Sequence, residues 1–246
     1  MIQENNFLSR LKSCRDNKWA QIKEDSNWVD FIINDNFSKD FYAIYLIETY
    51  HYVKENPRHQ ALVAVAGEGL PPNYFKFCYE HAEEETGHEL MALHDLNSLG
   101  YTVKKENIDA FSPLTETELL IAYLYYISQN GNPLRRVGYS FWAEDSYQYI
   151  QDLLKAISNK LNLSKENMTF LVSHSSIDEK HSAEIEEIIT KFCKTEKDFE
   201  DILEVMTTTI ELQAKMLEAV VNEYKKYISQ KSNKYSMLRN THEVLS

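Results

Sequence analysis

The sequence predicts an all-α protein that folds as a single helical bundle. The chain has 246 residues but only 6 glycines and 5 prolines, the residues that most often interrupt helices. Long stretches are rich in helix-favouring residues, and no segment convincingly reads as a β-strand. No linker rich in Pro, Gly or Ser divides the chain. We therefore expect one domain over residues 1–228, followed by a frayed or loosely docked tail at 229–246, where apolar periodicity is lost.

Helix-forming segments in the first half of the chain are separated by clear stop signals. Ser38 is a good N-cap for one of them, and Pro57 marks its end. Two consecutive prolines, Pro71 and Pro72, break the chain before a long segment that ends at Gly100. Helices are therefore expected over residues 5–22, 28–33, 38–56, 58–66 and 72–100.

The second half of the chain continues the helical pattern. The spacing Thr115-x-x-Glu118 is that of a capping box, and it opens a helix that closes at residue 131. The next helix starts near residue 133 and includes Glu144. Ser164 and Thr195 can cap the last two long helices. In total, we expect about seven to nine helices.

Composition and charge narrow the classes of function. The formal net charge is −12, with 38 acidic and 26 basic residues, which argues against a nucleic acid as partner. The three cysteines are scattered and form no C-x-x-C motif, so neither a disulfide framework nor a zinc knuckle is indicated. The N-terminus lacks the features of a signal peptide, and no segment approaches the length of a membrane span. We expect a soluble, cytoplasmic protein.

The strongest functional signal is a pattern that occurs twice, His-x3-acid-x2-His. The two copies are His81, Glu85, His88 and His174, Asp178, His181. On a helix, offsets of four and seven residues lie on one face, so each copy directs two imidazoles and a carboxylate to one point. Chance would produce roughly 0.04 such patterns per chain, and two of them in roughly one chain per thousand. Imidazole and carboxylate together, without thiolate, favour iron or manganese as the metal.

A helical bundle can hold two metal ions when facing helices supply carboxylates and two acid-x-x-His motifs. The chain has two such motifs, Glu85-x-x-His88 and Asp178-x-x-His181. It also places the isolated acids Glu144 and Glu48 within apolar and aromatic segments. An unpaired carboxylate in the core is costly, and metal coordination is one way to stabilise it.

Plainer interpretations compete with the metal site. Glu85 has acidic neighbours on both sides and can belong to a solvated helix face. The histidines and Asp178 can form a hydrogen-bonded network in the core, and Glu48 can be a salt-bridged structural acid. Because Glu85 and His88 suffice for one motif, His81 is expected beside the site rather than in it.

Aromatic and basic residues give weaker signals. Arg135 and Arg136 can bind a substrate carboxylate, although a surface location is favoured. Five tyrosines can line a pocket, although packing in the core is favoured for them: Tyr45, Tyr52, Tyr79, Tyr139 and Tyr147.

Segments around these residues resemble a known superfamily. Asn-Pro-Arg-His, then His-Ala-Glu-Glu-Glu-Thr-Gly-His and His-Asp-Leu-Asn-Ser-Leu-Gly, are similar to the heme-oxygenase-like (TenA-like) helical superfamily. Glu85-x-x-His88, Glu144 and His174-x3-Asp178-x2-His181 resemble the six-ligand set of its heme-oxygenase-like diiron oxidases and oxygenases. The resemblance covers about residues 40–190 and implies a heme-oxygenase-like bundle of about seven core helices.

The resemblance also implies a non-heme diiron centre that activates dioxygen. Its metal ligands would be Glu85, His88, Glu144, His174, Asp178 and His181. Glu48 and His81 are further candidates, either as ligands or as side chains that hydrogen-bond to ligands. The implied cofactors are two Fe2+ ions, with an Fe/Mn pair as an alternative, and O2 is the implied co-substrate.

The expected protein is therefore an oxidoreductase that oxidises a small amine, amino acid or fatty acid. The reaction would be N-oxygenation or oxidative carbon–carbon cleavage, in a biosynthetic pathway of specialised metabolism. A small-molecule substrate and a second copy in a homodimer are the expected partners, with no nucleic acid and no membrane. Three alternatives stay open: a self-modifying diiron protein that consumes its own tyrosine, a ferritin-like iron-oxidising protein, and a metal-free TenA-like module.

Overall fold

The structure, a computed structural model, describes residues 6–239, apart from the side chains of residues 173–180. Within this part the chain forms twelve α-helices and no strand. The helices are α1 (Phe7–Asp25), α2 (Asn27–Asn34), α3 (Lys39–Val53), α4 (Asn56–Ala66), α5 (Pro72–Glu84), α6 (Glu89–Ser98), α7 (Lys105–Asp109), α8 (Thr115–Gln129), α9 (Val137–Ala143), α10 (Ser146–Leu161), α11 (Thr169–Phe192) and α12 (Glu196–Ile228). The prediction of an all-α bundle is confirmed, while the number of helices is larger than expected because several segments are broken.

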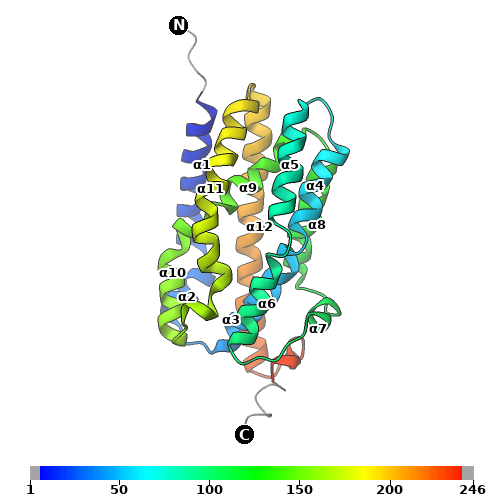
Figure 1. Cartoon of the computed structure of the whole chain (residues 1–246). Helices are drawn as coiled ribbons and strands as arrows, with labels where there is room; N and C mark the ends of the chain where they lie inside the picture. The colour runs from blue at the N-terminus through cyan, green and yellow to red at the C-terminus, as the bar shows by residue number, and fades with distance from the viewer. Residues whose placement is uncertain (1–5, 240–246) are drawn as a thin grey trace.

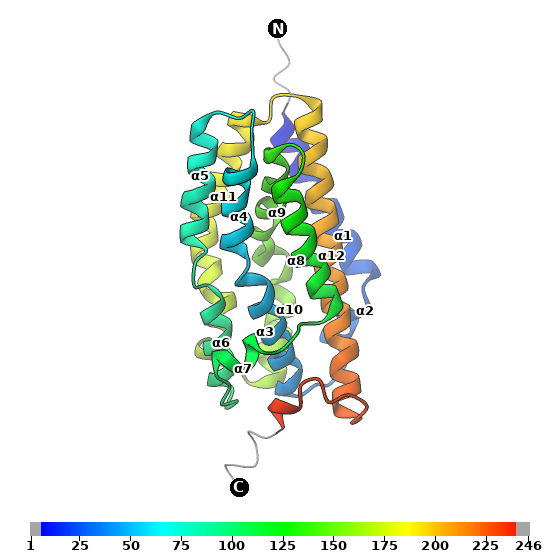
Figure 2. The ribbon, with the colours of Figure 1, turned by 90° about the vertical axis from the view of Figure 1, so that its right-hand side faces the viewer.

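The long helices run along one axis of an elongated bundle. Figure 1 shows α1, α5, α11 and α12 running along this axis. Helix α4 continues the direction of α3, and α6 that of α5, so each pair spans the bundle as one interrupted helix (Figure 2). No helix within the described residues combines the length and apolar character that crossing a membrane would require.

The short helix α9 lies inside the bundle, surrounded by longer helices in both views (Figures 1 and 2). Every residue from Val137 to Trp142 is buried. The long helix α12 packs against it, and the two backbones approach closely at Gly138. A Cβ atom at Gly138 would lie 2.3 Å from the carbonyl oxygen of Ile202, so only glycine fits this crossing.

Several helix starts agree with the predicted capping residues. Ser38 caps α3 by accepting a hydrogen bond from the backbone of Asp40, and Thr195 forms a capping box with Asp198 at the start of α12. The capping box predicted at Thr115 is wrong, because α8 begins at that residue and Leu114 occupies the N-cap position.

The start of α8 is stabilised instead by a distant carboxylate. Glu48, on α3, is completely buried and accepts hydrogen bonds from the Leu114 backbone nitrogen (2.9 Å) and the Thr117 hydroxyl (2.5 Å). Its other oxygen accepts a hydrogen bond of 2.6 Å from the hydroxyl of Tyr235. Glu48 therefore joins α3, α8 and the segment after α12.

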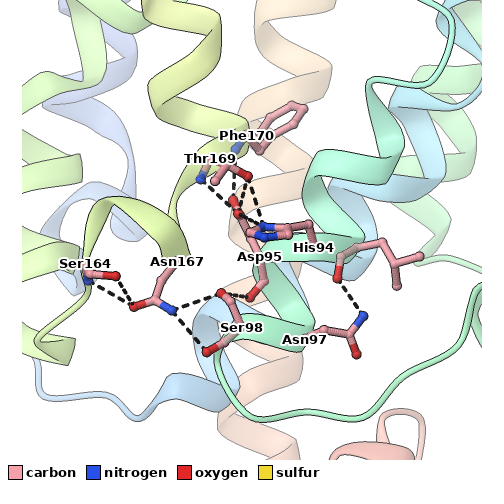
Figure 3. Close-up of polar contacts among 9 residues, drawn as sticks. His94, Asp95, Asn97, Ser98, Ser164, Asn167, Thr169 and Phe170 are labelled. Atoms are coloured by element: carbon pink, nitrogen blue, oxygen red, sulfur yellow. Dashed lines mark hydrogen bonds and ion pairs between the residues drawn. The ribbon is translucent and has the colours of Figure 1, made fainter.

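Helix α11 starts on a second buried carboxylate. Asp95, on α6, accepts hydrogen bonds of 2.9 Å from the backbone nitrogens of both Thr169 and Phe170 (Figure 3). Ser164, the predicted cap of this helix, caps only the short 3-10 turn Lys165–Asn167 that precedes it, so that prediction is wrong. The first turn of α11 is thus fixed to α6.

The single long helix predicted over residues 72–100 is also wrong. It divides into α5 and α6, and residues 85–88 form a turn between them. Gly87 has a φ of +94°, a backbone conformation that glycine adopts at little cost. Glu85 and His88 consequently lie in a turn, so His81, Glu85 and His88 do not share one continuous helical face.

The tail was expected to be frayed or loosely docked over residues 229–246. Its described part, up to residue 239, packs on the bundle through the fully buried side chains of Tyr235 and Leu238. Arg239 adds hydrogen bonds to the backbone oxygens of Tyr227 and Ser232. Residues 240–246 lie outside the described part of the chain.

Candidate metal centre

Three buried side chains from three separate elements meet in the middle of the bundle. They are His81 on α5, Glu144 at the end of α9 and His181 on α11. One ligand atom of each lies within 4.8 Å of the others. Glu144 stands between the two imidazoles: one carboxylate oxygen is 3.6 Å from Nε2 of His81, and the other is 3.3 Å from Nδ1 of His181.

More carboxylate and imidazole groups surround this trio. Glu84 places an oxygen 3.3 Å from Nε2 of His181. In the turn after α5, an oxygen of Glu85 lies 3.5 Å from Nδ1 of His88. The amide of Asn56 donates a hydrogen bond of 3.2 Å to the other oxygen of Glu85.

Interruptions in three helices bring these groups together. Asn56 begins α4 just after the break that follows α3, Glu85 and His88 lie in the break between α5 and α6, and Glu144 lies between α9 and α10. Each break frees a side chain from a continuous helical face and allows it to turn toward the centre. Helix α11 is continuous through this region and supplies His181.

The protonation states of the two buried imidazoles differ. The hydrogen bond to Glu144 raises the pKa of His181 to about 9, against the opposing effect of burial. Burial lowers the pKa of His81 to about 3, with a further decrease from the positive charge of Arg136. Burial also raises the pKa of Glu85, while the hydrogen bond from Asn56 opposes that rise. Without metal, His181 is therefore a cation beside Glu144, and His81 is neutral with a ring nitrogen available as a ligand.

A buried arginine lies behind the centre. The guanidinium of Arg136 donates to Nδ1 of His59 (3.3 Å) and to the hydroxyl of Ser140 (2.8 Å), and it stacks over the ring of Tyr139. The expected surface location is wrong for this residue, which is only 2% exposed. Its charge acts on both His81 and Glu85, so it contributes to the electrostatics of the centre.

The donor set fits a metal ion with oxygen and nitrogen preferences. Imidazole and carboxylate groups converge here, whereas the nearby thiol of Cys78 is buried, which raises its pKa to about 12 and keeps it protonated. Nδ1 of His81 has no hydrogen-bond partner among the described residues. A cluster of imidazoles and carboxylates is typical of iron and manganese sites rather than of zinc–thiolate sites.

A largely apolar cavity of about 160 Å³ adjoins the centre. Glu85 and Glu144 line it, together with side chains from α1, α2, α3, α4, α9, α10, α11 and α12. Four of the five tyrosines considered from the sequence contribute to its walls: Tyr45, Tyr52, Tyr139 and Tyr147. The fifth, Tyr79, is half exposed on α5. An organic molecule in this cavity would lie against the two carboxylates.

Comparison with known proteins identifies the family. Residues 43–214, well over half of the chain, match the model of a family described as iron-containing redox enzymes. The chain belongs to this family of iron-containing redox enzymes. The membership indicates an oxidoreductase, and it confirms the resemblance to the heme-oxygenase-like superfamily noted from the sequence motifs. No protein with a curated description matches the chain significantly.

Solved structures agree with this placement. A domain of unknown function with a heme oxygenase-like fold from Shewanella denitrificans is 43% identical and has a TM-score of 0.86, covering 90% of this chain and 95% of that one. A TenA homologue from Pseudomonas syringae pv. tomato has 14% identity and a TM-score of 0.70, covering 88% of this chain and 93% of that one. A TenA homologue from P. horikoshii has 12% identity and a TM-score of 0.67, with 87% and 97% covered. The TenA homologues support the fold alone.

Within this family member, the predicted ligands fall into three groups. Four of them lie in the region of the centre: Glu85, His88, Glu144 and His181. His81 lies in the same region, and its ligand atom is within 4.8 Å of those of Glu144 and His181. Glu48 makes its described contacts with α8 and Tyr235 instead. The side chains of His174 and Asp178 lie outside the described residues.

Glu84 and Asn56 are contact residues of the centre that the sequence patterns did not select. Glu84 is three residues from His81, and the spacing rule that selected Glu85 at four residues admits it equally well. Asn56 begins a helix beside a proline, and nothing in that local sequence indicates that its amide reaches Glu85. Only the tertiary structure reveals this hydrogen bond.

Proposed function

We propose that this oxidoreductase is a non-heme diiron enzyme that uses dioxygen to oxidise a small organic substrate. The observation that carries the proposal is the buried group of His81, Glu144 and His181, whose ligand atoms lie within 4.8 Å of one another beside an apolar cavity. Membership of the iron-containing redox enzymes supports iron as the metal.

The residues that would hold the metal come from two sources. The sequence patterns supply Glu85, His88, Glu144, His174, Asp178 and His181. The contacts around the centre add His81, through its approach to Glu144, and Glu84, through its approach to His181. Bound iron would supply the electrons and the open coordination positions that dioxygen reduction requires.

Other side chains determine the environment in which the reaction would take place. The cavity walls are largely aromatic and aliphatic, which excludes water from a reactive centre and orients a substrate against Glu85 and Glu144. Asn56 fixes the direction of the Glu85 carboxylate through a hydrogen bond of 3.2 Å. The buried charge of Arg136 offsets part of the negative charge that the carboxylates bring into the core.

The cavity favours a substrate whose apolar portion is small enough to fit inside it. Its volume of about 160 Å³ is small, and Trp19, Trp28 and Phe41 are among its lining residues. Small amines, apolar amino acids and fatty acids remain the substrate classes we propose. Oxidation by N-oxygenation or by carbon–carbon cleavage, within specialised metabolism, is the corresponding reaction.

Anaerobic titration of the metal-free protein with Fe2+ tests this proposal directly. We expect about two irons per chain, and dioxygen consumption that accelerates when a true substrate from these classes is present. His88→Ala and His181→Ala should each reduce the bound iron, whereas His94→Ala, at a side chain that is 59% exposed, should not. Full iron occupancy in both His88→Ala and His181→Ala would refute the diiron assignment.

A second candidate function is self-modification, in which the protein oxidises one of its own tyrosines. The position of Tyr139 favours this candidate: the residue lines the cavity, and its hydroxyl lies 3.4 Å from the side-chain oxygen of Asn56, the partner of Glu85. Aerobic loading with iron followed by mass spectrometry separates the two functions. A mass change confined to one tyrosine, without turnover of added substrate, would favour self-modification.

A further inference from the structure

An acidic groove lies on the outside of the bundle between α5 and α11. Its walls carry five carboxylates and one imidazole: Glu80, Glu83, Glu84, Glu184, Glu187 and His81. Five acids around one groove produce a negative potential that attracts cations, and the net charge of the whole chain, −12, has the same sign. The proposed metal centre lies directly behind this surface.

His81 connects the groove to the interior. It lines the groove, yet it is only 3% exposed, and its Nδ1 has no hydrogen-bond partner among the described residues. Its Nε2 lies 3.6 Å from the carboxylate of Glu144. One side chain therefore belongs both to the wall of the groove and to the buried trio.

Glu84 makes a second connection. Its side chain is 37% exposed and lines the groove, while its carboxylate lies 3.3 Å from Nε2 of His181. The exposed Glu80, Glu83 and Glu187 line the groove together with Glu84, and Glu84 and the buried Glu144 approach the two different nitrogens of the His181 ring. The imidazoles of His81 and His181 both approach the carboxylate of Glu144.

The groove and the apolar cavity contact the centre through different side chains. Glu85 and Glu144 line the cavity, His81 and Glu84 line the groove, and none of the residues whose side chains the structure describes lines both. A hydrated cation is poorly solvated by the aromatic walls of the cavity, whereas carboxylate oxygens can replace its water molecules.

We propose that the acidic groove is a binding site for a divalent cation, Fe2+, on its way to the metal centre. The outer carboxylates capture the hydrated ion, and Glu84 and His81 exchange their ligand atoms for its waters as it moves inward. No electron is transferred in this step, and the organic substrate uses the separate apolar cavity. This inference rests on the proposed function, because it requires a metal centre behind the groove.

The rate of Fe2+ uptake by the metal-free protein tests the groove. The variant Glu80→Gln/Glu83→Gln/Glu187→Gln removes three exposed acids of the groove without changing Glu84 or the buried trio. The matched control, Glu106→Gln/Glu118→Gln/Glu200→Gln, removes three exposed acids elsewhere and gives the same net charge. Stopped-flow mixing with Fe2+ under anaerobic conditions, at low and at high salt, gives the uptake rate, and metal analysis gives the final stoichiometry.

We expect the groove variant to take up Fe2+ about three- to tenfold more slowly than wild type at low salt, and the control variant to differ by less than twofold. High salt should reduce this difference, and all three proteins should reach the same final stoichiometry. Equal uptake rates for the groove and control variants would overturn the groove proposal. If wild type itself binds no iron, the diiron function fails instead, so the two failures are distinguishable.

Discussion

The carboxylate of Asp95 accepts a hydrogen bond of 2.9 Å from the backbone nitrogen of Thr169, the first residue of α11. This contact fixes the helix that carries His181 to α6, the helix that directly follows the turn with Glu85 and His88. Asp95, which is completely buried, therefore fixes the relative position of two parts of the proposed centre that are far apart in the sequence. A negative charge at this helix start also offsets the partial positive charge of the helix terminus.

Replacing Asp95 with asparagine should destabilise the fold. The two carboxylate oxygens of Asp95 accept from the backbone nitrogens of Thr169 and Phe170, one each. Asparagine has an NH2 group in place of one oxygen, so one of these two nitrogens loses its hydrogen bond. We expect the free energy of unfolding to fall by about 2–3 kcal/mol, measured by urea denaturation. Asp152→Asn, at a side chain that is 86% exposed, serves as the control and should change it by less than about 0.5 kcal/mol. Equal stability of the two variants would contradict this role of Asp95.

Replacing His81 with glutamine should lower the iron content from about two ions to about one per chain. The reason is that Nε2 of His81 lies 3.6 Å from the carboxylate of Glu144, so both side chains can bind the same ion. His81 also lines the acidic groove. Metal analysis after anaerobic loading measures the content, with His94→Gln as a control that retains both ions. If His81→Gln binds two irons as tightly as wild type, His81 is a neighbour of the centre and not a ligand.

Replacing Glu48 with glutamine should reduce stability and leave the iron content unchanged. The carboxylate accepts from Leu114, Thr117 and Tyr235, and an amide nitrogen cannot accept from any of them. A loss of about 1–3 kcal/mol in the free energy of unfolding is expected, and Tyr235→Phe, which removes one of the three bonds, should lose less. Loss of iron without loss of stability would instead make Glu48 a metal ligand.

Acidification should destabilise the protein in part through His51. Burial lowers the pKa of this imidazole from 6.5 to about 4. The unfolded chain therefore binds a proton between these two pH values that the folded chain does not, and stability falls as the pH drops from 6.5 toward 4. This group contributes at most about 3 kcal/mol to the loss. His51→Phe should show a shallower decline over this window in urea denaturation, and identical slopes for both proteins would refute the effect.

Replacing Gly138 with alanine should be strongly destabilising. The added Cβ would meet the carbonyl oxygen of Ile202 at 2.3 Å and the nitrogen of Met206 at 2.9 Å, both of which are backbone atoms of α12 that cannot rotate away. We expect a loss of about 3 kcal/mol or more, or failure to fold, measured by thermal denaturation. Ala143→Gly, at the end of the same helix, should cost no more than about 1 kcal/mol. A mild effect of Gly138→Ala would mean that α9 and α12 can separate.

Local sequence signals were sufficient for the fold class and for many helix ends. Ser38 and Thr195 cap their helices as predicted, because a cap involves backbone groups only two or three residues away. Thr115 and Ser164 fail for the opposite reason: α8 and α11 are capped by Glu48 and Asp95, which are more than sixty residues distant in the chain. No local pattern reveals such a cap.

Local sequence patterns also could not predict which side chains meet at the candidate centre. The doubled histidine pattern selected residues on α5 and α11, but its first copy assumed one continuous helix. The break at Gly87 removes that continuity, and the tertiary structure then determines which of His81, Glu84 and Glu85 approaches His181 or Glu144. Glu48 and Glu144 also look alike in sequence, as lone acids among apolar residues. Backbone and hydroxyl donors surround Glu48, whereas imidazoles flank Glu144.

The crossing of α9 and α12 at Gly138 has an evolutionary consequence. Glu144 lies six residues further along the chain from this glycine, so a change in the distance between the two helices would displace the carboxylate from its imidazole neighbours. Homologues that retain a glycine at this position can keep the same separation, and those with a larger residue must have moved one helix. The identity of that single residue therefore offers a simple criterion for deciding which related sequences can inherit a functional assignment made for this protein.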